Sequence, residues 1–198
     1  MLKRFRVVGL CLVAVFALSA VAASSASAFT TFKAKLPTGG TFPASVTGTG
    51  GEQVFTDETG GTPVKCTAAT ATGVANSTSE PTTIQKVKYT GCKASIDNVH
   101  EIVAEYKIHA NGEVDIVNPI AIKVEGIGAC EIVVGAQEKL KLLTFENNAA
   151  KTEITTKAKE VGITSKGSGG LCGGAHTGGT YTGTVISKLE KGGELFVE

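Results

Sequence analysis

The chain has 198 residues, with 19 basic and 18 acidic side chains and a formal net charge of +1. Both arginines, Arg4 and Arg6, lie in the first six residues, so the remainder is arginine-free and close to neutral. Clustered positive charge supplies most of the affinity for nucleic acids, and arginine is the usual side chain for phosphate recognition. The composition therefore argues against a nucleic-acid partner.

The first 28 residues predict a secretory signal peptide. Three basic residues within the first six precede an apolar run, Val7–Leu18, and the segment ends in Ala26-Ser27-Ala28. A cationic start, a short apolar core and a small-residue cleavage site are typical of signal peptidase substrates. The apolar run is shorter than the ~20 residues that cross a bilayer. We expect cleavage after Ala28 and a secreted or cell-surface product without a membrane span; the alternative is an uncleaved N-terminal anchor.

The mature part of the chain predicts a β-protein. Residues 29–40 are rich in Thr and Lys and contain Pro37, so we expect a flexible leader there. Residues 41–198 show no linker and are expected to form a single domain. The β-branched residues Thr and Val are abundant, and paired glycines recur as turn signals. Many short strands between such breaks predict an all-β fold, an antiparallel β-sandwich or, alternatively, a partly closed β-barrel.

Short apolar and β-branched segments between the turn signals define the expected strands. Gly50-Gly51 and Gly178-Gly179 are expected to be turns, and 136–143 could instead form a short helical turn. The strands expected outside the centre of the chain are Thr41–Thr47, Glu52–Thr56, Val64–Thr70, Thr83–Tyr89, Ile120–Glu125, Cys130–Val134, Lys139–Glu146, Lys151–Val161, Thr180–Leu189 and Leu195–Val197.

The centre of the chain predicts a β-hairpin. Between His100 and His109 the even positions 102–108 are apolar, and the residues between them are mostly polar. This period of two indicates a half-buried strand. Asn111-Gly112 favours a two-residue turn, because both positions accept a positive φ. Glu113–Val117 resumes the alternation, and Pro119 ends the second strand or marks a sheet edge.

Four cysteines remain after cleavage, Cys66, Cys92, Cys130 and Cys172. An even number in an exported chain predicts two disulfides, and three pairings are possible. We favour Cys66–Cys92 and Cys130–Cys172, because each pair would join neighbouring strands of one half of the domain. A four-cysteine zinc site would instead need closely spaced pairs of ligands, which the chain lacks. We expect neither a metal nor a cofactor.

Candidate catalytic residues are few. His100 and His109 are nine residues apart on one expected strand and should point to opposite faces, so they should not share a metal. His176 lies in a glycine-rich segment expected to be a loop, where it could act as a base for a Cys172 nucleophile. Cys172 in a disulfide would exclude that chemistry. The chain has no tryptophan, and its three tyrosines, far apart in sequence, are not expected to form a carbohydrate-stacking platform.

The order and spacing of several short motifs resemble a group of exported Thr/Gly-rich β-proteins of high-GC actinobacteria that have no assigned activity. The resemblance covers residues 41–188 and implies a secreted β-domain with two disulfides, and a Cys66–Cys92 pair agrees with it. The motifs that carry it are Lys65-Cys66-Thr67, Tyr89-Thr90-Gly91-Cys92, Cys130-Glu131-Ile132, Gln137, Leu171-Cys172 and Thr180-Tyr181-Thr182-Gly183.

No group of polar residues converges in the sequence as a reactive centre would. We therefore expect a non-enzymatic extracellular module that acts in surface association, matrix structure or partner binding. Its partner would be an extracellular protein or a surface component. Two alternatives are a small secreted hydrolase with a site near His176, and a protease inhibitor presenting a disulfide-flanked loop at 73–82 or 165–180.

Overall fold

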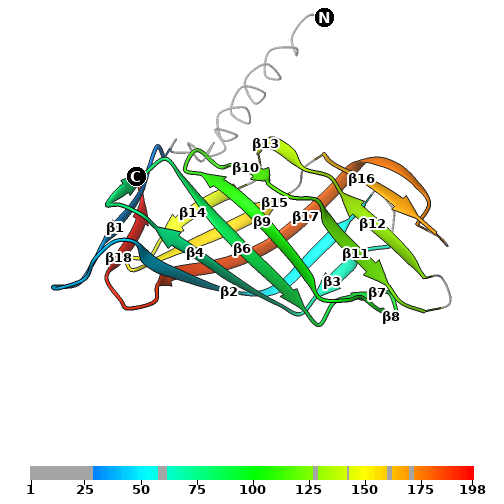
Figure 1. Ribbon diagram of the computed structural model, residues 1–198, viewed down its shortest axis with the longest axis horizontal. Coiled ribbons are helices and arrows are strands. Elements are labelled where there is room, and N and C mark those ends of the chain that lie inside the picture. Colours follow the sequence, from blue (N-terminus) through cyan, green and yellow to red (C-terminus); the bar gives the residue numbers. More distant parts are fainter. Residues whose placement is uncertain (1–28, 58–61, 127–128, 142, 160–161, 170–171) are drawn as a thin grey trace, which may run out of the picture.

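The computed structural model describes residues 29–57, 62–126, 129–141, 143–159, 162–169 and 172–198 (Figure 1). Every regular element in these ranges is a β-strand, so the predicted all-β class is confirmed. Within the same ranges, no helix has the length and apolarity to cross a membrane. The predicted signal peptide lies outside the described residues.

The described part of the chain contains eighteen strands. In chain order they are β1 (Phe32–Lys35), β2 (Ala44–Thr56), β3 (Val64–Cys66), β4 (Ala68–Ala75), β5 (Ser79–Glu80), β6 (Thr82–Thr90), β7 (Lys93–Ala94), β8 (Asp97–Asn98), β9 (Ile102–His109), β10 (Glu113–Ile116), β11 (Ile120–Val124), β12 (Cys130–Val134), β13 (Gln137–Lys141), β14 (Leu143–Asn147), β15 (Glu153–Lys159), β16 (Ile163–Ser168), β17 (Gly174–Leu189) and β18 (Glu194–Val197).

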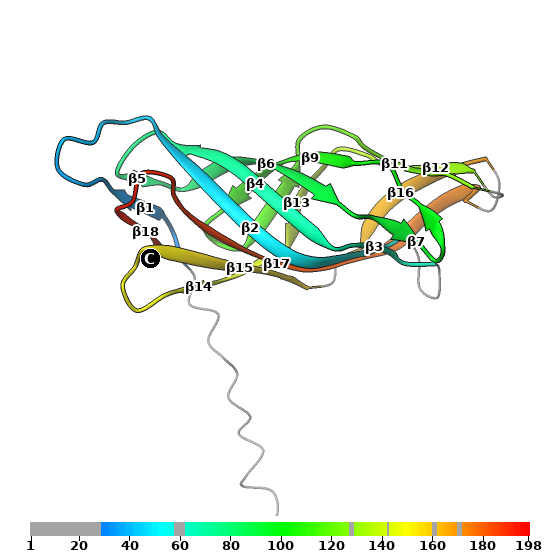
Figure 2. The same cartoon turned by 90° about the horizontal axis from the view of Figure 1, so that it is seen from below.

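Fifteen of these strands form one antiparallel sheet, and the other three form a small second sheet. The main path runs β11-β12-β16-β17-β2-β4-β6-β9-β10-β13, with β14 joined through β15 to β17, and β8 joined through β7 and β3 to β2. The small sheet has the order β18-β1-β5. Figure 2 shows it at one end of the molecule, with β11, β12 and β16 at the other.

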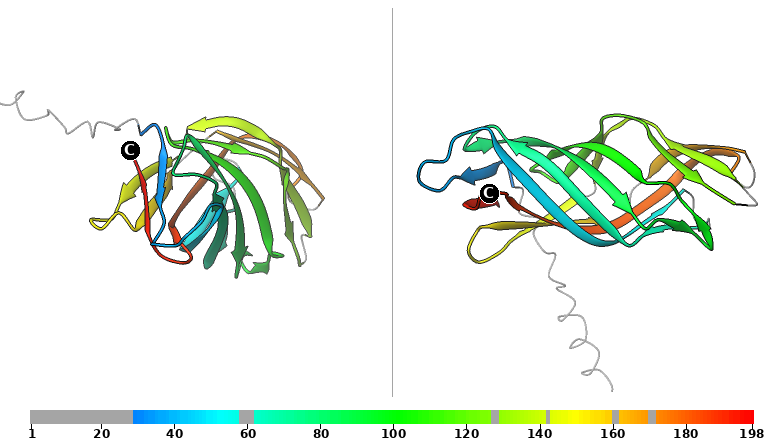
Figure 3. Two further views of the ribbon diagram at one scale, coloured as in Figure 1. Left: turned by 60° about the vertical axis from the view of Figure 1, so that its left-hand side comes forward. Right: turned by 60° about the horizontal axis from the view of Figure 1, so that its bottom comes forward.

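The large sheet curls until distant strands meet, which gives it the partly closed barrel form (Figure 3). Val99, just before β9, forms a bridge with Val124 of β11. On the other side, the Leu143 amide donates to the Gly112 carbonyl over 2.9 Å and so joins β14 to the β9–β10 turn. These contacts enclose an interior that the long strands β2, β6, β9 and β17 cross.

The central hairpin is confirmed, but the two-residue turn predicted for it is wrong. β9 and β10 pair antiparallel with Val114 opposite Ile108. Residues 110–112 connect them, the Gly112 amide donates to the His109 carbonyl over 3.0 Å, and of Asn111 and Gly112 only Gly112 has a positive φ, +88°. Val114 and Ile108 are buried, as the period-two pattern predicted. Beyond β10 lies β13, which is the last strand of the path.

Two expected turns are instead parts of long strands. β2 continues through Gly50-Gly51, where its pairing with β17 shifts between Gly183 and Val185. β17 likewise runs through Gly178-Gly179. A side chain at Gly179 would lie only 2.8 Å from the Ile163 carbonyl oxygen, so this glycine permits the close approach of β16, a strand missed from the sequence.

The flexible leader expected at residues 29–40 is a wrong prediction, because β1 lies within it. Phe32 and Ala34 of β1 are buried, and Phe32 pairs in register with Val197 of β18. The Phe32 ring meets the Phe145 ring edge to face, with centroids 5.5 Å apart. β1 pairs with the edge of the C-terminal strand β18, and the sequence around β1 does not indicate this partner.

Both favoured disulfides are present, Cys66–Cys92 and Cys130–Cys172. Cys66 and Cys92 are buried in the apolar core of the curled sheet. Cys130 and Cys172 are only partly buried and link β12 to the segment between β16 and β17. With all four sulfurs bonded in pairs, none is a free thiolate ligand or nucleophile.

Candidate ligand site inside the curled sheet

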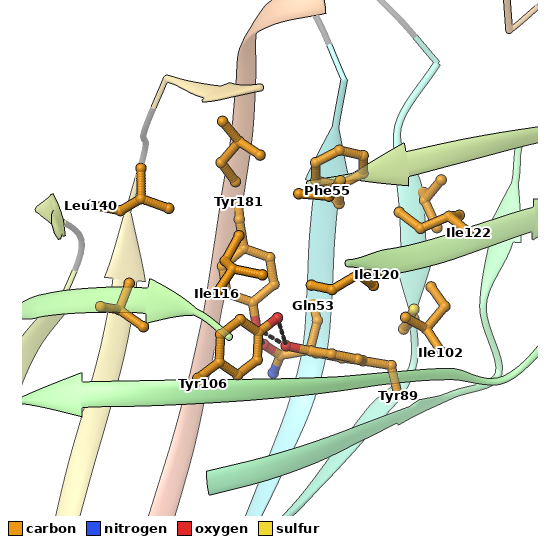
Figure 4. A pocket seen from close by; sticks show the side chains of 15 residues that line it. Gln53, Phe55, Tyr89, Ile102, Tyr106, Ile116, Ile120, Ile122, Leu140 and Tyr181 are labelled. Carbon is orange, nitrogen blue, oxygen red and sulfur yellow. Dashed lines mark hydrogen bonds between the residues drawn. The ribbon is translucent and has the colours of Figure 1, made fainter. Parts of the chain in front are cut away.

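Four polar side chains meet in the middle of the apolar interior (Figure 4). Gln53 comes from β2, Tyr89 from β6, Tyr106 from β9 and Tyr181 from β17. Gln53 is 2% exposed and Tyr89 is 5% exposed. Buried polar groups are costly unless they are hydrogen-bonded, so each of the four is expected to have a hydrogen-bond partner.

The pairing of the strands brings these four residues together. On β2 and β17, Gln53 lies opposite Gly183, and Tyr181 lies opposite Phe55. On β6 and β9, Tyr89 lies opposite Ile102. Alternate residues of a strand share one face, and the curl of the sheet turns both pairs of strands towards the same interior space.

Gln53 is held by the irregularity in β2. The pairing between β2 and β17 shifts next to Gln53. At this shift the carbonyl groups of Gly51 and Thr184 accept hydrogen bonds from the Gln53 side chain. The Gln53 Nε2 atom lies 3.1 Å from each of these oxygens. A Cβ atom at Gly183 would overlap Gln53 Oε1, so the glycine opposite leaves room for the amide.

The three phenol groups continue the network from Gln53. Tyr181 donates to Gln53 Oε1 over 2.5 Å, and Tyr89 donates to the Tyr181 oxygen over 3.3 Å. The Tyr89 and Tyr106 oxygens are 2.9 Å apart. The Tyr89 and Tyr181 rings also meet edge to face, with centroids 6.2 Å apart.

Apolar cavities lie on both sides of this network. One cavity of about 70 Å³ extends towards β11 and β12, and another of about 70 Å³ extends towards β14 and β15. Tyr89, Tyr106, Tyr181 and Val114 line both, so the phenol rings separate the two spaces. Isoleucines make up a large part of the first wall: Ile102, Ile116, Ile120, Ile122 and Ile163.

A third, smaller cavity of about 30 Å³ continues the row towards the small sheet. It shares Gln85, Ile108 and Thr156 with the second cavity. The Ser187 hydroxyl lines it and forms no hydrogen bond within the described part of the protein. A space of this size with several polar groups can hold a water molecule.

Burial keeps the phenols neutral. Loss of hydration raises the pKa of Tyr106 to about 12, although its hydrogen bond with Tyr89 acts in the opposite direction. Burial, the neighbouring phenols and their hydrogen bonds raise the pKa of Tyr89 well above its usual value. Burial also raises the pKa of Tyr181, and a charge on Tyr106 would raise it further. The site therefore presents hydroxyl groups without charge at neutral pH.

We predict that the folded protein resists tyrosine ionisation well beyond pH 10, the ordinary pKa of the side chain. Because folding raises these pKa values, the stabilisation is fully present below pH 10 and is lost as the pH rises towards about 12. All three tyrosines of the chain lie in the network, so tyrosinate absorbance reports on it alone. The absorbance should rise together with the loss of far-ultraviolet circular dichroism, and the urea-unfolded chain, as control, should titrate near pH 10. A tyrosine that ionises near pH 10 in the folded protein would contradict the buried network.

The histidines do not converge on one centre. His100 Nε2 lies 2.8 Å from a carboxylate oxygen of Glu125, and His109 Nε2 lies 2.9 Å from one of Asp115. Burial raises the pKa of Asp115, but its hydrogen bonds with His109 and the Lys139 amide, and the nearby positive charges, lower that pKa overall. Asp115 thereby joins β13 to β10.

His176 lies on β17, so its predicted position in a loop is wrong. Its Nε2 atom is 3.7 Å from Asp57 Oδ2, and both side chains are 12% exposed. Ser165 lies opposite His176 in the pairing of β16 and β17, but its hydroxyl has no hydrogen-bond partner among the described residues. The Cys172 nucleophile considered with His176 is excluded by the disulfide to Cys130.

The two loops considered for protease inhibition are largely strands. Residues 73–82 include the end of β4 and all of β5, which pairs with β1. Residues 165–180 are mostly β16 and β17, with 170–171 outside the described residues. Across the ranges that the structure describes, no group of three or more His, Cys, Asp or Glu side chains is placed to hold a metal ion.

The clustering of the tyrosines was not predicted. Positions 89, 106 and 181 are far apart in sequence, so their spacing gives no sign that the three side chains meet. The alternation placed Tyr106 with Ile102 and Ile108 on one face of its strand, which was a signal that this polar side chain points inward. Nothing local indicated that Tyr181 and Gln53 would lie beside it.

Comparisons with known proteins add no relative: no protein family, curated protein or solved structure matches the chain. The resemblance to exported actinobacterial proteins stays a prediction.

Proposed function

We propose that the mature protein is a secreted, non-enzymatic binding module that holds a small, mostly apolar molecule inside the curled sheet. The observation that supports this most is the network of one amide and three phenols with an apolar cavity of about 70 Å³ on each side. Binding sites for small molecules are typically apolar spaces with a few converging polar groups that orient the ligand.

A purely structural role explains this interior less well. Apolar side chains would fill the same volume without the cost of burying four polar groups. Native cores also contain few voids larger than a water molecule. The two larger cavities are separated by phenol rings, and a shift of one ring would join them. The joined space would approach the ~150 Å³ of an engineered cavity that binds benzene.

The edge of β13 is the proposed entrance. β13 is the last strand of the sheet path, and Leu140 on it lines the first cavity. Leu143, at the start of β14, lines the second cavity. Both leucines are partly exposed, so movement of this edge would open the interior to solvent.

Export is part of the proposal, and the disulfides support it. Two disulfides are typical of proteins in oxidising compartments, and they agree with the signal peptide predicted for residues 1–28. The extracellular protein or surface partner expected from the sequence stays a prediction.

Benzene is a suitable probe for the proposed site. Its titration should raise the melting temperature of the exported protein in a saturable way, because a ligand that binds only the folded state stabilises it. Leu140→Phe should fill part of the first cavity and reduce this rise. Ile96→Phe is the matched control, since Ile96 is 88% exposed and lines neither larger cavity. The absence of a saturable response up to the solubility limit of benzene would overturn the proposed function, and so would an equal response in Leu140→Phe.

A further inference from the structure

The orientation of the Gln53 side chain is fixed by its surroundings. Two carbonyl oxygens, of Gly51 and Thr184, each lie 3.1 Å from one end of the amide. Carbonyl oxygens only accept hydrogen bonds, so this end must be the NH₂ group. The other end, Oε1, is therefore an acceptor, and Tyr181 donates to it.

This orientation determines the direction of every hydrogen bond in the network. A phenol has a single hydrogen to donate. The Tyr181 hydrogen goes to Gln53, so the hydrogen between Tyr181 and Tyr89 must come from Tyr89. Tyr89 then has none left, and the hydrogen between Tyr89 and Tyr106 must come from Tyr106. All three phenol hydrogens are therefore engaged, and each is donated in the direction that leads from Tyr106 to Gln53.

Tyr106 is the last residue in this series of hydrogen bonds. Its oxygen gives a hydrogen to Tyr89 and receives none from any described residue, so its capacity to accept is unused. Tyr106 lines both larger cavities. The apolar interior therefore presents a neutral hydrogen-bond acceptor and offers no free phenol hydrogen.

We infer that the ligand is a small neutral alcohol, whose hydroxyl donates to Tyr106 and whose apolar part fills the first cavity. This inference rests on the proposed function. Among the described residues, no charged side chain lines either larger cavity, so an ammonium or carboxylate group would be buried there without a counter-charge. Ethers and ketones only accept hydrogen bonds, and in the described lining of the first cavity every phenol and amide hydrogen is already engaged, whereas the donors Gln85 and Thr156 line the second cavity and not the first.

Probes of equal length test the hydroxyl requirement. 1-Hexanol, methyl pentyl ether, hexylamine and hexanoate have similar apolar parts and differ in the polar group. Each would be titrated into the exported protein at neutral pH, with tyrosine fluorescence as the readout, because the chain has no tryptophan and its three tyrosines form the network. We expect 1-hexanol to bind about fivefold to tenfold more tightly than the ether, the value of one hydrogen bond. The two charged probes should bind more weakly than the ether.

Two variants test the role of Tyr106 directly. Tyr106→Phe removes this acceptor and should lower the affinity for 1-hexanol, although not fully to that for the ether, because the Tyr89 oxygen loses its donor and can accept in its place. Tyr89→Phe leaves the Tyr106 hydrogen without its acceptor, so Tyr106 can donate to a ligand, and the affinity for the ether should rise. Melting temperatures would confirm that both variants fold. If either variant fails to fold, the comparison of the four probes in the unmodified protein still tests the inference.

The outcomes separate the two proposals. Equal binding of alcohol and ether would overturn the hydroxyl requirement and leave the binding function in place. Binding of hexylamine or hexanoate more tightly than 1-hexanol would likewise overturn the hydroxyl requirement and leave the binding function in place. Benzene binding that is reduced by Leu140→Phe, together with no binding of 1-hexanol, would also overturn only the inference. Failure of benzene and all four probes to bind would overturn both.

Discussion

Replacing Gln53 with leucine is expected to lower the free energy of unfolding by about 3–5 kcal/mol, because three groups lose the hydrogen bonds that they make with this buried amide, at about 1–3 kcal/mol each. The carbonyls of Gly51 and Thr184 lose the donor that holds them, and the Tyr181 hydroxyl loses its acceptor. Leucine has a similar size, so the effect comes mainly from hydrogen bonding. Urea unfolding at neutral pH, followed by circular dichroism, measures it.

Gln137→Leu is the matched control. Gln137 also donates to two carbonyls, of Gly135 and Thr164, and its Oε1 accepts from the Thr164 amide. It is only partly buried, so water can replace much of what it loses. We expect less than half of the loss seen for Gln53→Leu. Equal losses would show that burial of the Gln53 network adds nothing to stability.

Removal of the Cys66–Cys92 disulfide by a double change to alanine should cost about 4–5 kcal/mol. Loop closure alone gives about 3.5 kcal/mol for a separation of 26 residues. Both sulfurs are buried in the core, and Cys66 lines the first cavity, so truncation also enlarges a void. Denaturant unfolding of the double variant under non-reducing conditions measures the total.

The Cys130–Cys172 pair is the comparison for this prediction. Its separation of 42 residues gives a slightly larger loop-closure value, about 4 kcal/mol. Cys130 and Cys172 are only partly buried, so their removal adds less loss of packing. We expect the order to be the reverse of loop length, with the Cys66–Cys92 variant less stable. The opposite order would show that chain entropy outweighs packing at these sites.

Features that depend on local pattern were predictable from the sequence. The β9–β10 hairpin followed from the alternation in β9 and from the turn signal Asn111-Gly112, since the face of a strand and the place of a turn depend on neighbouring residues, although the connection has three residues and not the predicted two. The two disulfides followed from the number of cysteines and from the choice of neighbouring strands. Each of these properties involves residues close in the chain or a strong chemical constraint.

Glycine pairs show where local pattern was insufficient. Gly50-Gly51 and Gly178-Gly179 have the composition of turns, yet both lie within long strands. Glycine favours a turn through its backbone freedom and also permits close approach of another strand. The sequence does not distinguish these uses, because the approaching group belongs to another part of the chain.

The sequence by itself determined that this protein is built of strands, contains one sharp central hairpin and carries cysteines suited to two disulfides. Only the tertiary structure decided that β1 joins the C-terminal strand and that Gln53, Tyr89, Tyr106 and Tyr181 meet in one interior. The physical reason is that a period of two specifies which face of a strand is buried but not which strands become neighbours. Gln53 and Tyr181 are 128 residues apart, and the pairing of β2 with β17 brings them within hydrogen-bonding distance, while the curl of the sheet turns Tyr89 and Tyr106 towards them.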